Sequence, residues 1–214
     1  MSGRSLAHKQ GSTLSVERWL KNVSRETFER LTVFESLLLR WNRHAGLIAE
    51  STIPQLWNRH FLDSAQLMSC APKATHWLDI GSGAGFPGLV LAILAADNSL
   101  APRFTLIESG SRKCEFLRRV IRETGVEVEL LEMRCEDAEP QNADAVTARA
   151  VASLKALLTL AIPHVSHDGV MIFPKGRNRA NEIDALGSTK GFFDVKEVTS
   201  LTDPEAAILV LRRT

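Results

Sequence analysis

The first third of the chain has the hydrophobic pattern of helices. Ser24 is suited to be an N-cap, and Glu26 stands in the turn that would follow it. Apolar residues then recur every three or four positions, at Phe28, Leu31, Phe34, Leu38, Trp41 and Ala45. This spacing predicts one apolar face of a helix. Similar but shorter patterns over residues 16–23 and 61–68 predict a helix before it and another after the turn at Pro54.

From about residue 76 the pattern changes to short β-rich runs separated by helical ones. The predicted strands are THWLDIG (75–81), RFTLIES (103–109), EVELLEM (127–133), ADAVTARA (143–150), GVMIFPKG (169–176), FFDVKEV (192–198) and AILVLRR (207–213). Such alternation is typical of a doubly wound, mainly parallel, seven-stranded Rossmann-like sheet. We therefore expect a flexible tail over 1–14, a helical extension over 15–75 packed on the core, and an α/β domain over 76–214.

Composition and charge limit the number of domains and the kinds of ligand that the chain can bind. The 214 residues, 44% of them hydrophobic, suit one domain, and 26 Lys and Arg against 25 Asp and Glu leave a net charge of +1. Any binding of a polyanion must then come from local patches. The three cysteines have neither disulfide nor metal-ligand spacing, so we expect no metal. The chain shows no secretory signal and no apolar run of about 20 residues, so a cytoplasmic protein without membrane contact is expected. We also expect a monomer.

The stretch LDIGSGAGFPG (78–88) predicts a strand, a glycine turn and a helix that starts near Pro87. The free N–H groups of that helix would face the cleft beyond the strand, where open α/β sheets bind ligands. Gly83, Gly85 and Gly88 fit the spacing G-x-G-x-x-G, and Glu108 follows 20 residues later. A dinucleotide-dependent dehydrogenase is formally allowed by this pattern.

Two acidic residues favour a different ligand. Asp79, at the end of the first strand, would repel a pyrophosphate but attract the cationic amino group and sulfonium of S-adenosylmethionine. Glu108, at the end of the second strand, can accept hydrogen bonds from both ribose hydroxyls. The pattern therefore favours an S-adenosylmethionine-dependent methyltransferase with a sheet of the class I methyltransferase type.

The methyl acceptor is constrained by motifs that the chain lacks. The segment AVTARAVASL (145–154) does not contain the Asn- or Asp-Pro-Pro-aromatic motif of transferases that modify exocyclic base amines. Cytosine C5 transfer needs a cysteine nucleophile, and no cysteine lies in a Pro-Cys loop. An acceptor with a lone pair, such as guanine N7, needs no deprotonation, so orientation and desolvation can supply most of the catalysis.

Basic residues cluster at two places. Arg112 and Lys113 start the helix after the second strand, and Lys175 and Arg177 follow the fifth strand. Such patches bind phosphates without reading bases, so these four residues are candidate RNA contacts. For the first pair, a solvated helix face is the alternative.

Several segments together resemble one family. They are WNRHAGLIAEST (41–52), RHFLDS (59–64), LDIGSGAGFPG (78–88), LIESGSRKCEFLRRV (106–120), TARAVASL (147–154) and PKG (174–176). The chain is similar to the RsmG family, also called GidB or glucose-inhibited division protein B, which methylates guanine N7 in the 530 loop of bacterial 16S ribosomal RNA. The resemblance implies S-adenosylmethionine as cofactor and 16S rRNA, or a small-subunit assembly intermediate, as partner.

The same resemblance implies a set of cofactor contacts. By position they fall on Gly81, Phe86, Cys135, Glu136 and Arg149, to which the loop chemistry adds Asp79, Gly83 and Glu108. Arg149 could bind the cofactor carboxylate, the base or a phosphate, or could pair with Asp79. His60 and Asp63 could hold the N-terminal helices over the pocket, and His60 could alternatively act as a base.

Two other functions stay open at this stage. The same fold could methylate a small molecule or a protein, or the chain could be a nucleotide-binding module without catalysis.

Overall fold

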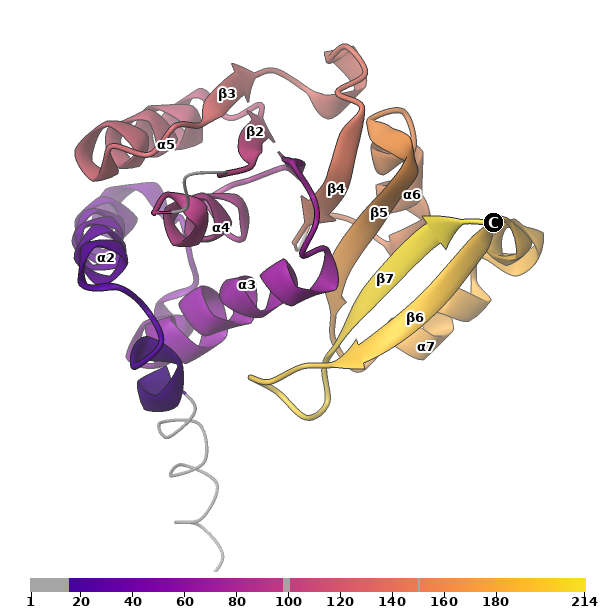
Figure 1. The fold of residues 1–214 in the computed structure, drawn as a ribbon, viewed down its shortest axis with the longest axis horizontal. Helices are drawn as coiled ribbons and strands as arrows, with labels where there is room; N and C mark the ends of the chain where they lie inside the picture. The colour runs from indigo at the N-terminus through magenta and orange to yellow at the C-terminus, as the bar shows by residue number, and fades with distance from the viewer. Residues whose placement is uncertain (1–15, 98–100, 150) are drawn as a thin grey trace, which may run out of the picture.

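A seven-stranded sheet forms the centre of the computed structural model, which describes residues 16–97, 101–149 and 151–214. The strand order is β3-β2-β1-β4-β5-β7-β6. The strands are β1 His76–Ile80, β2 Arg103–Glu108, β3 Glu129–Glu132, β4 Ala143–Ala148, β5 Val165–Lys175, β6 Phe193–Thr199 and β7 Ala207–Arg213. The first five pair in parallel, and β7 runs antiparallel to both β5 and β6 (Figure 1). The predicted sheet is confirmed, whereas the predicted tail over 1–14 lies outside the described residues.

One strand starts earlier than the sequence predicts. β5 begins at Val165 rather than at Gly169, and its pairing with β4 shifts register between Ala143 and Ala145. Residues 166–168 of this added stretch are polar and largely exposed. They therefore lack the apolar pattern by which a strand is recognised in a sequence.

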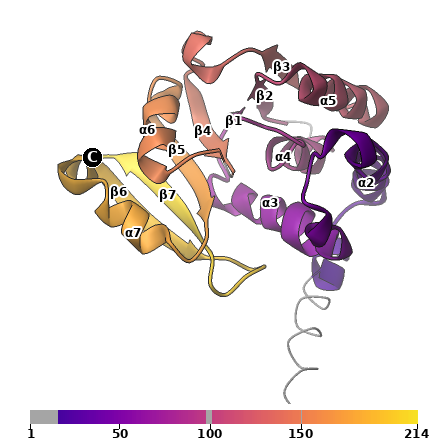
Figure 2. The same cartoon turned by 180° about the vertical axis from the view of Figure 1, so that it is seen from behind.

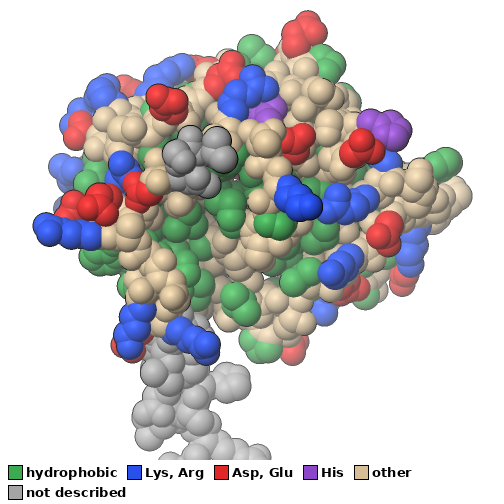
Figure 3. All heavy atoms as spheres, in the orientation of Figure 1, with side chains coloured by type: hydrophobic (Ala, Val, Ile, Leu, Met, Phe, Trp, Pro, Cys, Tyr) green, Lys and Arg blue, Asp and Glu red, His purple; other side chains and the backbone are tan. Residues whose placement is uncertain are grey.

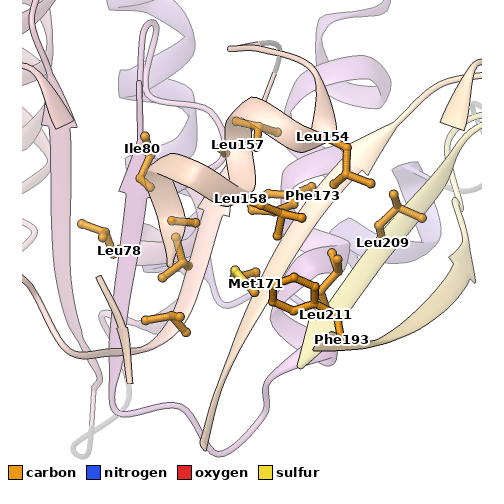
Figure 4. Close-up of a cluster of buried hydrophobic side chains, with 14 of the residues drawn as sticks. Leu78, Ile80, Leu154, Leu157, Leu158, Met171, Phe173, Phe193, Leu209 and Leu211 are labelled. Carbon is orange, nitrogen blue, oxygen red and sulfur yellow. The ribbon is translucent and has the colours of Figure 1, made fainter. Parts of the chain in front are cut away.

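Helices cover both faces of the sheet. After a helical stretch over residues 16–20, the helical elements are α2 Arg25–Ala45, η1 Glu50–Gln55, η2 Trp57–Leu62, α3 Asp63–Ala65, η3 Gln66–Cys70, α4 Gly88–Ala95, α5 Ser111–Thr124, η4 Cys135–Asp137, α6 Leu154–Ala161, α7 Arg179–Asp184 and η5 Gly187–Phe192. α6 and α7 lie on one face, seen from behind in Figure 2, and α4 and α5 lie on the other. Figure 4 shows the packing of the first face, where Leu154, Leu157 and Leu158 meet the sheet.

The helix predicted from Ser24 onward is present as α2. Ser24 Oγ accepts a hydrogen bond from Thr27 N at 3.0 Å, and the helix ends at Gly46 in the left-handed conformation. Three predicted core positions, Leu31, Phe34 and Leu38, are fully buried. The pattern after Pro54 also forms successive helical turns, from η2 through η3. Local periodicity was therefore sufficient to find these elements.

An aromatic cluster connects the N-terminal helices to the glycine loop. The ring of Phe34 on α2 lies 5.1 Å from that of Phe86 and 5.3 Å from that of Phe61 on η2. Phe61 and Phe86 are themselves 5.4 Å apart. Aromatic contacts of this kind contribute roughly 1 kcal/mol each beyond the burial of their surface. The cluster therefore fixes one side of the glycine loop, while the division of the chain into two parts near residue 76 stays a prediction.

Candidate functional site

A cavity of about 1230 Å³ lies at the carboxyl ends of the central strands. Its walls come from the N-terminal segment 47–66, the glycine loop 81–86, the ends of β2, β4 and β5, and the loop between β6 and β7. Sites for one small ligand usually occupy about 300–1,000 Å³. The cavity is therefore large enough to take a nucleoside-sized ligand together with part of a second molecule.

The glycine loop lies close to Val151, which forms part of the cavity wall after β4. Gly81 has φ +65°, and a Cβ atom at this position would lie 2.8 Å from Val151 Cγ2. Both Gly81 and Ser82 donate backbone hydrogen bonds to the carbonyl of Ile107 on β2, at 2.8 and 3.1 Å. Glycine is thus required twice at this position, for its backbone conformation and for the space that a side chain would fill.

Asp79 faces away from this cavity. Its carboxylate is 3% exposed, and its Oδ2 accepts a hydrogen bond from Gly88 N at 3.1 Å while Oδ1 accepts one from Thr147 Oγ1 at 2.9 Å. Burial raises the pKa of Asp79 to about 6. In this arrangement Asp79 joins the start of α4 to the end of β4. Direct contact between Asp79 and the cofactor therefore stays a prediction that these contacts do not favour.

Glu108 does line the cavity, next to the glycine loop. Its Oε2 accepts from Gly83 N at 2.9 Å and its Oε1 accepts from Gly110 N at 2.8 Å, while Lys113 Nζ lies 3.8 Å away. A carboxylate oxygen has a second acceptor position, so each oxygen can still bind a hydroxyl group. Glu108 is therefore held in a fixed orientation that suits the two neighbouring hydroxyls of a ribose.

Arg149, immediately after β4, has several protein partners. Its Nη2 donates to His60 Nδ1 at 2.9 Å, its Nη1 donates to the carbonyl of Arg59 at 3.2 Å, and Asp63 Oδ2 lies 3.6 Å from Nη1. The guanidinium also lies 5.0 Å from the centre of the Phe86 ring. The ion pair thus forms with Asp63 and not with Asp79, and burial lowers the pKa of Arg149 while these two carboxylates oppose the shift.

His60 is held in one neutral form by these contacts. An arginine can only donate, so His60 Nδ1 must accept, and its Nε2–H then donates to Thr52 Oγ1 at 2.9 Å. Thr52 in turn donates to the carbonyl of Ala49 at 2.7 Å. Burial, and then the charge of Arg149, lower the pKa of His60 to about 4. Contacts of His60 and Asp63 with Arg149 hold the N-terminal segment against the cavity, in agreement with the structural role considered for them.

Cys135 and Glu136 are not brought together with the glycine loop. Cys135 is 7% exposed, its Sγ faces the carbonyl of Leu160 at 3.8 Å, and burial raises the pKa of its thiol to about 11. Glu136 is exposed, and neither residue is part of the cavity lining. Their contact with the cofactor therefore stays a prediction that the cavity lining does not support. A buried, neutral thiol such as that of Cys135 is also unsuited to nucleophilic catalysis.

The candidate RNA contacts differ in how available their charges are. Lys175 lines the cavity, but its Nζ donates to Glu182 Oε2 at 2.8 Å and to the carbonyl of Ala152 at 3.0 Å. Arg177 is 81% exposed, with Glu205 3.3 Å away. Arg112 is exposed at the start of α5, next to the half-exposed Lys113. Figure 3 shows basic and acidic side chains interspersed on the face seen in Figure 1.

Sequence reasoning did not find several residues that build the site. Glu182 also accepts a hydrogen bond from Leu154 N at 2.6 Å, and Gln66 and Thr202 form part of the cavity wall. These contacts join segments far apart in the chain, so no local pattern marks them. In residues 16–97, 101–149 and 151–214, no three metal-binding side chains gather and no helix is long and apolar enough to cross a membrane.

The buried carboxyl of Asp79 predicts a pH dependence of stability. Because its pKa is raised from 3.8 to about 6, the folded protein holds an extra proton between these values, and the free energy of unfolding falls as pH rises through them. Asp79→Asn removes this titration. Relative to the wild type, the variant should gain up to about 3 kcal/mol between pH 4 and pH 7, measured by urea unfolding. Parallel pH profiles of the two proteins would contradict the assignment.

Comparison with known proteins agrees with this geometry. Residues 27–207 match the family model GidB, described as rRNA small subunit methyltransferase G. A protein named ribosomal RNA small subunit methyltransferase G from Ruegeria sp. is 46% identical over 191 residues, covering 89% of this chain and 93% of that protein. One of the same name from Rhodospirillum centenum is 48% identical over 190 residues, covering 88% and 85%.

Solved structures show the same fold. A methyltransferase from Geobacter sulfurreducens has a TM-score of 0.59 and 16% sequence identity, covering 94% of this chain and 96% of that one. Together with the family match over residues 27–207, this confirms the resemblance seen in the motifs. The chain belongs to the rRNA small subunit methyltransferase G (GidB) family.

Proposed function

We propose that the protein transfers a methyl group from S-adenosylmethionine to N7 of a guanine in the 530 loop of 16S ribosomal RNA. The relatives named ribosomal RNA small subunit methyltransferase G support the substrate class. The observation that carries the proposal is the cavity in which Glu108 faces the glycine loop and Arg149 forms another wall. Since the substrate is ribosomal RNA, we propose a cytoplasmic enzyme whose partner is 16S rRNA or a small-subunit assembly intermediate.

The residues around the glycine loop suit this cofactor. S-adenosylmethionine supplies a methyl group on a positively charged sulfur. Glu108 can hold two ribose hydroxyls, and Gly81, which has no side chain, lets Val151 pack closely against the glycine loop. Gly83 and Phe86 also border the cavity, so they belong to the proposed cofactor site. Arg149 lies over the Phe86 ring and forms the neighbouring wall.

The acceptor chemistry agrees with the state of His60. His60 uses Nδ1 to accept from Arg149 and Nε2–H to donate to Thr52. Guanine N7 carries a lone pair and loses no proton when it is methylated. The residues of the cavity would therefore act by binding, orienting and desolvating the base.

Methyl transfer to RNA tests the function directly. Purified protein, labelled S-adenosylmethionine and small-subunit rRNA from a strain lacking the gene should yield label in the RNA, and chemical cleavage at 7-methylguanine should map it to the 530 loop. Unlabelled RNA with a labelled small molecule or protein would support the alternative substrates. A protein that binds RNA but transfers no methyl group would instead be a non-catalytic binding module.

Gly81→Asp should abolish cofactor binding, because it places a side chain in the narrow space next to Val151. Gly125→Asp is a matched control, since Gly125 has φ +66° at the end of α5 and a Cβ there would meet nothing within 4 Å. Both variants share the backbone strain of a positive φ, which costs about 1 kcal/mol, and Gly81→Asp should lose further stability because its side chain meets Val151. Calorimetric titration should detect S-adenosylmethionine binding only in the control, and retained binding by Gly81→Asp would contradict the placement.

We further propose that Arg112, Lys113, Lys175 and Arg177 contact rRNA phosphates. Arg177 is the sharpest test, because its pair with Glu205 is exposed to solvent, whereas Lys175 is buried against Glu182. Arg177→Ala should weaken RNA binding and lower the slope of log K against log salt by about one unit. Arg25→Ala, which removes an equally exposed arginine paired with Glu29 on α2, is the control. Equal losses of RNA affinity in Arg177→Ala and Arg25→Ala would contradict a specific contact at Arg177.

A further inference from the structure

The carboxylate of Asp63 stands between two walls of the cavity. Asp63 is a half-buried residue at the start of α3, within the N-terminal helical segment. One of its oxygens, Oδ2, faces the guanidinium of Arg149 at 3.6 Å. The other, Oδ1, accepts from Thr202 Oγ1 in the β6–β7 loop at 2.7 Å. A single side chain thus joins the end of β4 to a loop more than fifty residues later in the chain.

The contact with Arg149 belongs to a wider set of bonds. Arg149 also donates to the carbonyl of Arg59 and to His60 Nδ1, so residues 59–63 surround the guanidinium. Among these partners Asp63 carries the opposite charge, and it is only 19% exposed. A charge pair that is shielded from water is strongly weakened by the loss of one partner, because the other charge is left without compensation. The orientation of Arg149 therefore depends on Asp63.

The contact with the β6–β7 loop is equally well supported. Gln66 Nε2 donates to Asp63 Oδ1 at 2.9 Å and to Ser200 Oγ at 3.2 Å, and Gln66 Oε1 accepts from Leu201 N at 2.8 Å. The loop is thus bound through a backbone group as well as through two hydroxyls. Leu201 itself is 68% exposed beside these contacts. The shape of this loop therefore follows from contacts made by the helical segment.

We propose that Asp63 is a positioning residue that fixes both Arg149 and the β6–β7 loop, and so sets the part of the cavity that receives the acceptor base. The inference rests on the proposed function, because only an acceptor molecule requires that part of the cavity. Asp63, Gln66, Arg149 and Thr202 all line the cavity, whereas the glycine loop and Glu108 form its other side. Asp63 would act through Arg149 and the loop, without contact to the reacting atoms.

Two substitutions separate the two arms of Asp63, which are its ion pair with Arg149 and its hydrogen bond with Thr202. Asp63→Asn removes the charge opposite Arg149 but keeps an oxygen that can accept from Thr202. Thr202→Val removes the hydroxyl and leaves the ion pair intact. Asp144→Asn is the matched control, because Asp144 Oδ2 accepts from Thr75 Oγ1 at 2.7 Å at the opposite end of the sheet. For each protein, methyl transfer to small-subunit rRNA, S-adenosylmethionine affinity and hydrogen exchange of the backbone amides of 200–203 are measured.

Asp63→Asn should lower kcat/KM for RNA at least tenfold while the amides of 200–203 exchange within threefold of the wild type. Thr202→Val should instead raise amide exchange in that loop at least tenfold and raise the KM for RNA, with kcat within twofold. Asp144→Asn should change neither kcat/KM for RNA nor amide exchange in 200–203. The split between the two variants is the decisive result, because general destabilisation would change both quantities together.

Two outcomes would overturn the inference. One is an Asp63→Asn enzyme with kcat/KM within twofold of the wild type; the other is an Asp144→Asn control with the same losses. If the wild type transfers no methyl group to rRNA, the proposed function fails instead. Asp63→Ala still tests the positioning role in that case, because loss of both arms should accelerate amide exchange in 200–203 at least tenfold, and unchanged exchange would refute it.

Discussion

A half-buried guanidinium needs partners, and this requirement determines how the site is assembled. Arg149 leaves the sheet at the end of β4, where the cavity begins, and its charge is partly withdrawn from water. Its partners are Arg59, His60 and Asp63, almost 90 residues earlier in the chain. Without them an uncompensated charge would remain beneath the helical layer. The N-terminal segment is therefore a necessary part of the cavity, and the aromatic contacts of Phe34 and Phe61 with Phe86 hold it in place.

The shape of the glycine loop also depends on charged groups that need partners, in this case the carboxylates of Asp79 and Glu108. Asp79 accepts from the first N–H of α4, and Glu108 accepts from the N–H groups of Gly83 and Gly110. Each carboxylate thus fixes backbone groups that a helix start or a turn would otherwise leave without partners. The loop is held in one shape by the protein itself, so little ordering remains to be done when a ligand binds.

Much of the fold could be predicted from the sequence, and less of the site. Strands such as residues 76–80 and 207–213 are apolar runs between turn residues, and α2 has a regular apolar face, so local patterns revealed them. Glu108 was also found, because its position at the end of β2 determines where it points. Asp79 lies one residue before the end of β1, on the face that α4 covers, and its carboxylate accepts from Gly88 N, a contact that depends on how α4 packs on the sheet. The pairings Arg149–Asp63 and Lys175–Glu182 depend on tertiary contacts, for which one sequence has no local signal.

The same contacts explain why His60 is not available as a general base. His60 is the imidazole nearest to Arg149, yet accepting a hydrogen bond from a guanidinium occupies the lone pair that a base would use. Burial, and then the positive charge of Arg149, disfavour protonation of the His60 ring and lower its pKa to about 4. The thiols of Cys114 and Cys135 are buried, and burial raises the pKa of each to about 11. Such a site favours an acceptor atom that already carries a free lone pair, and guanine N7 is such an atom.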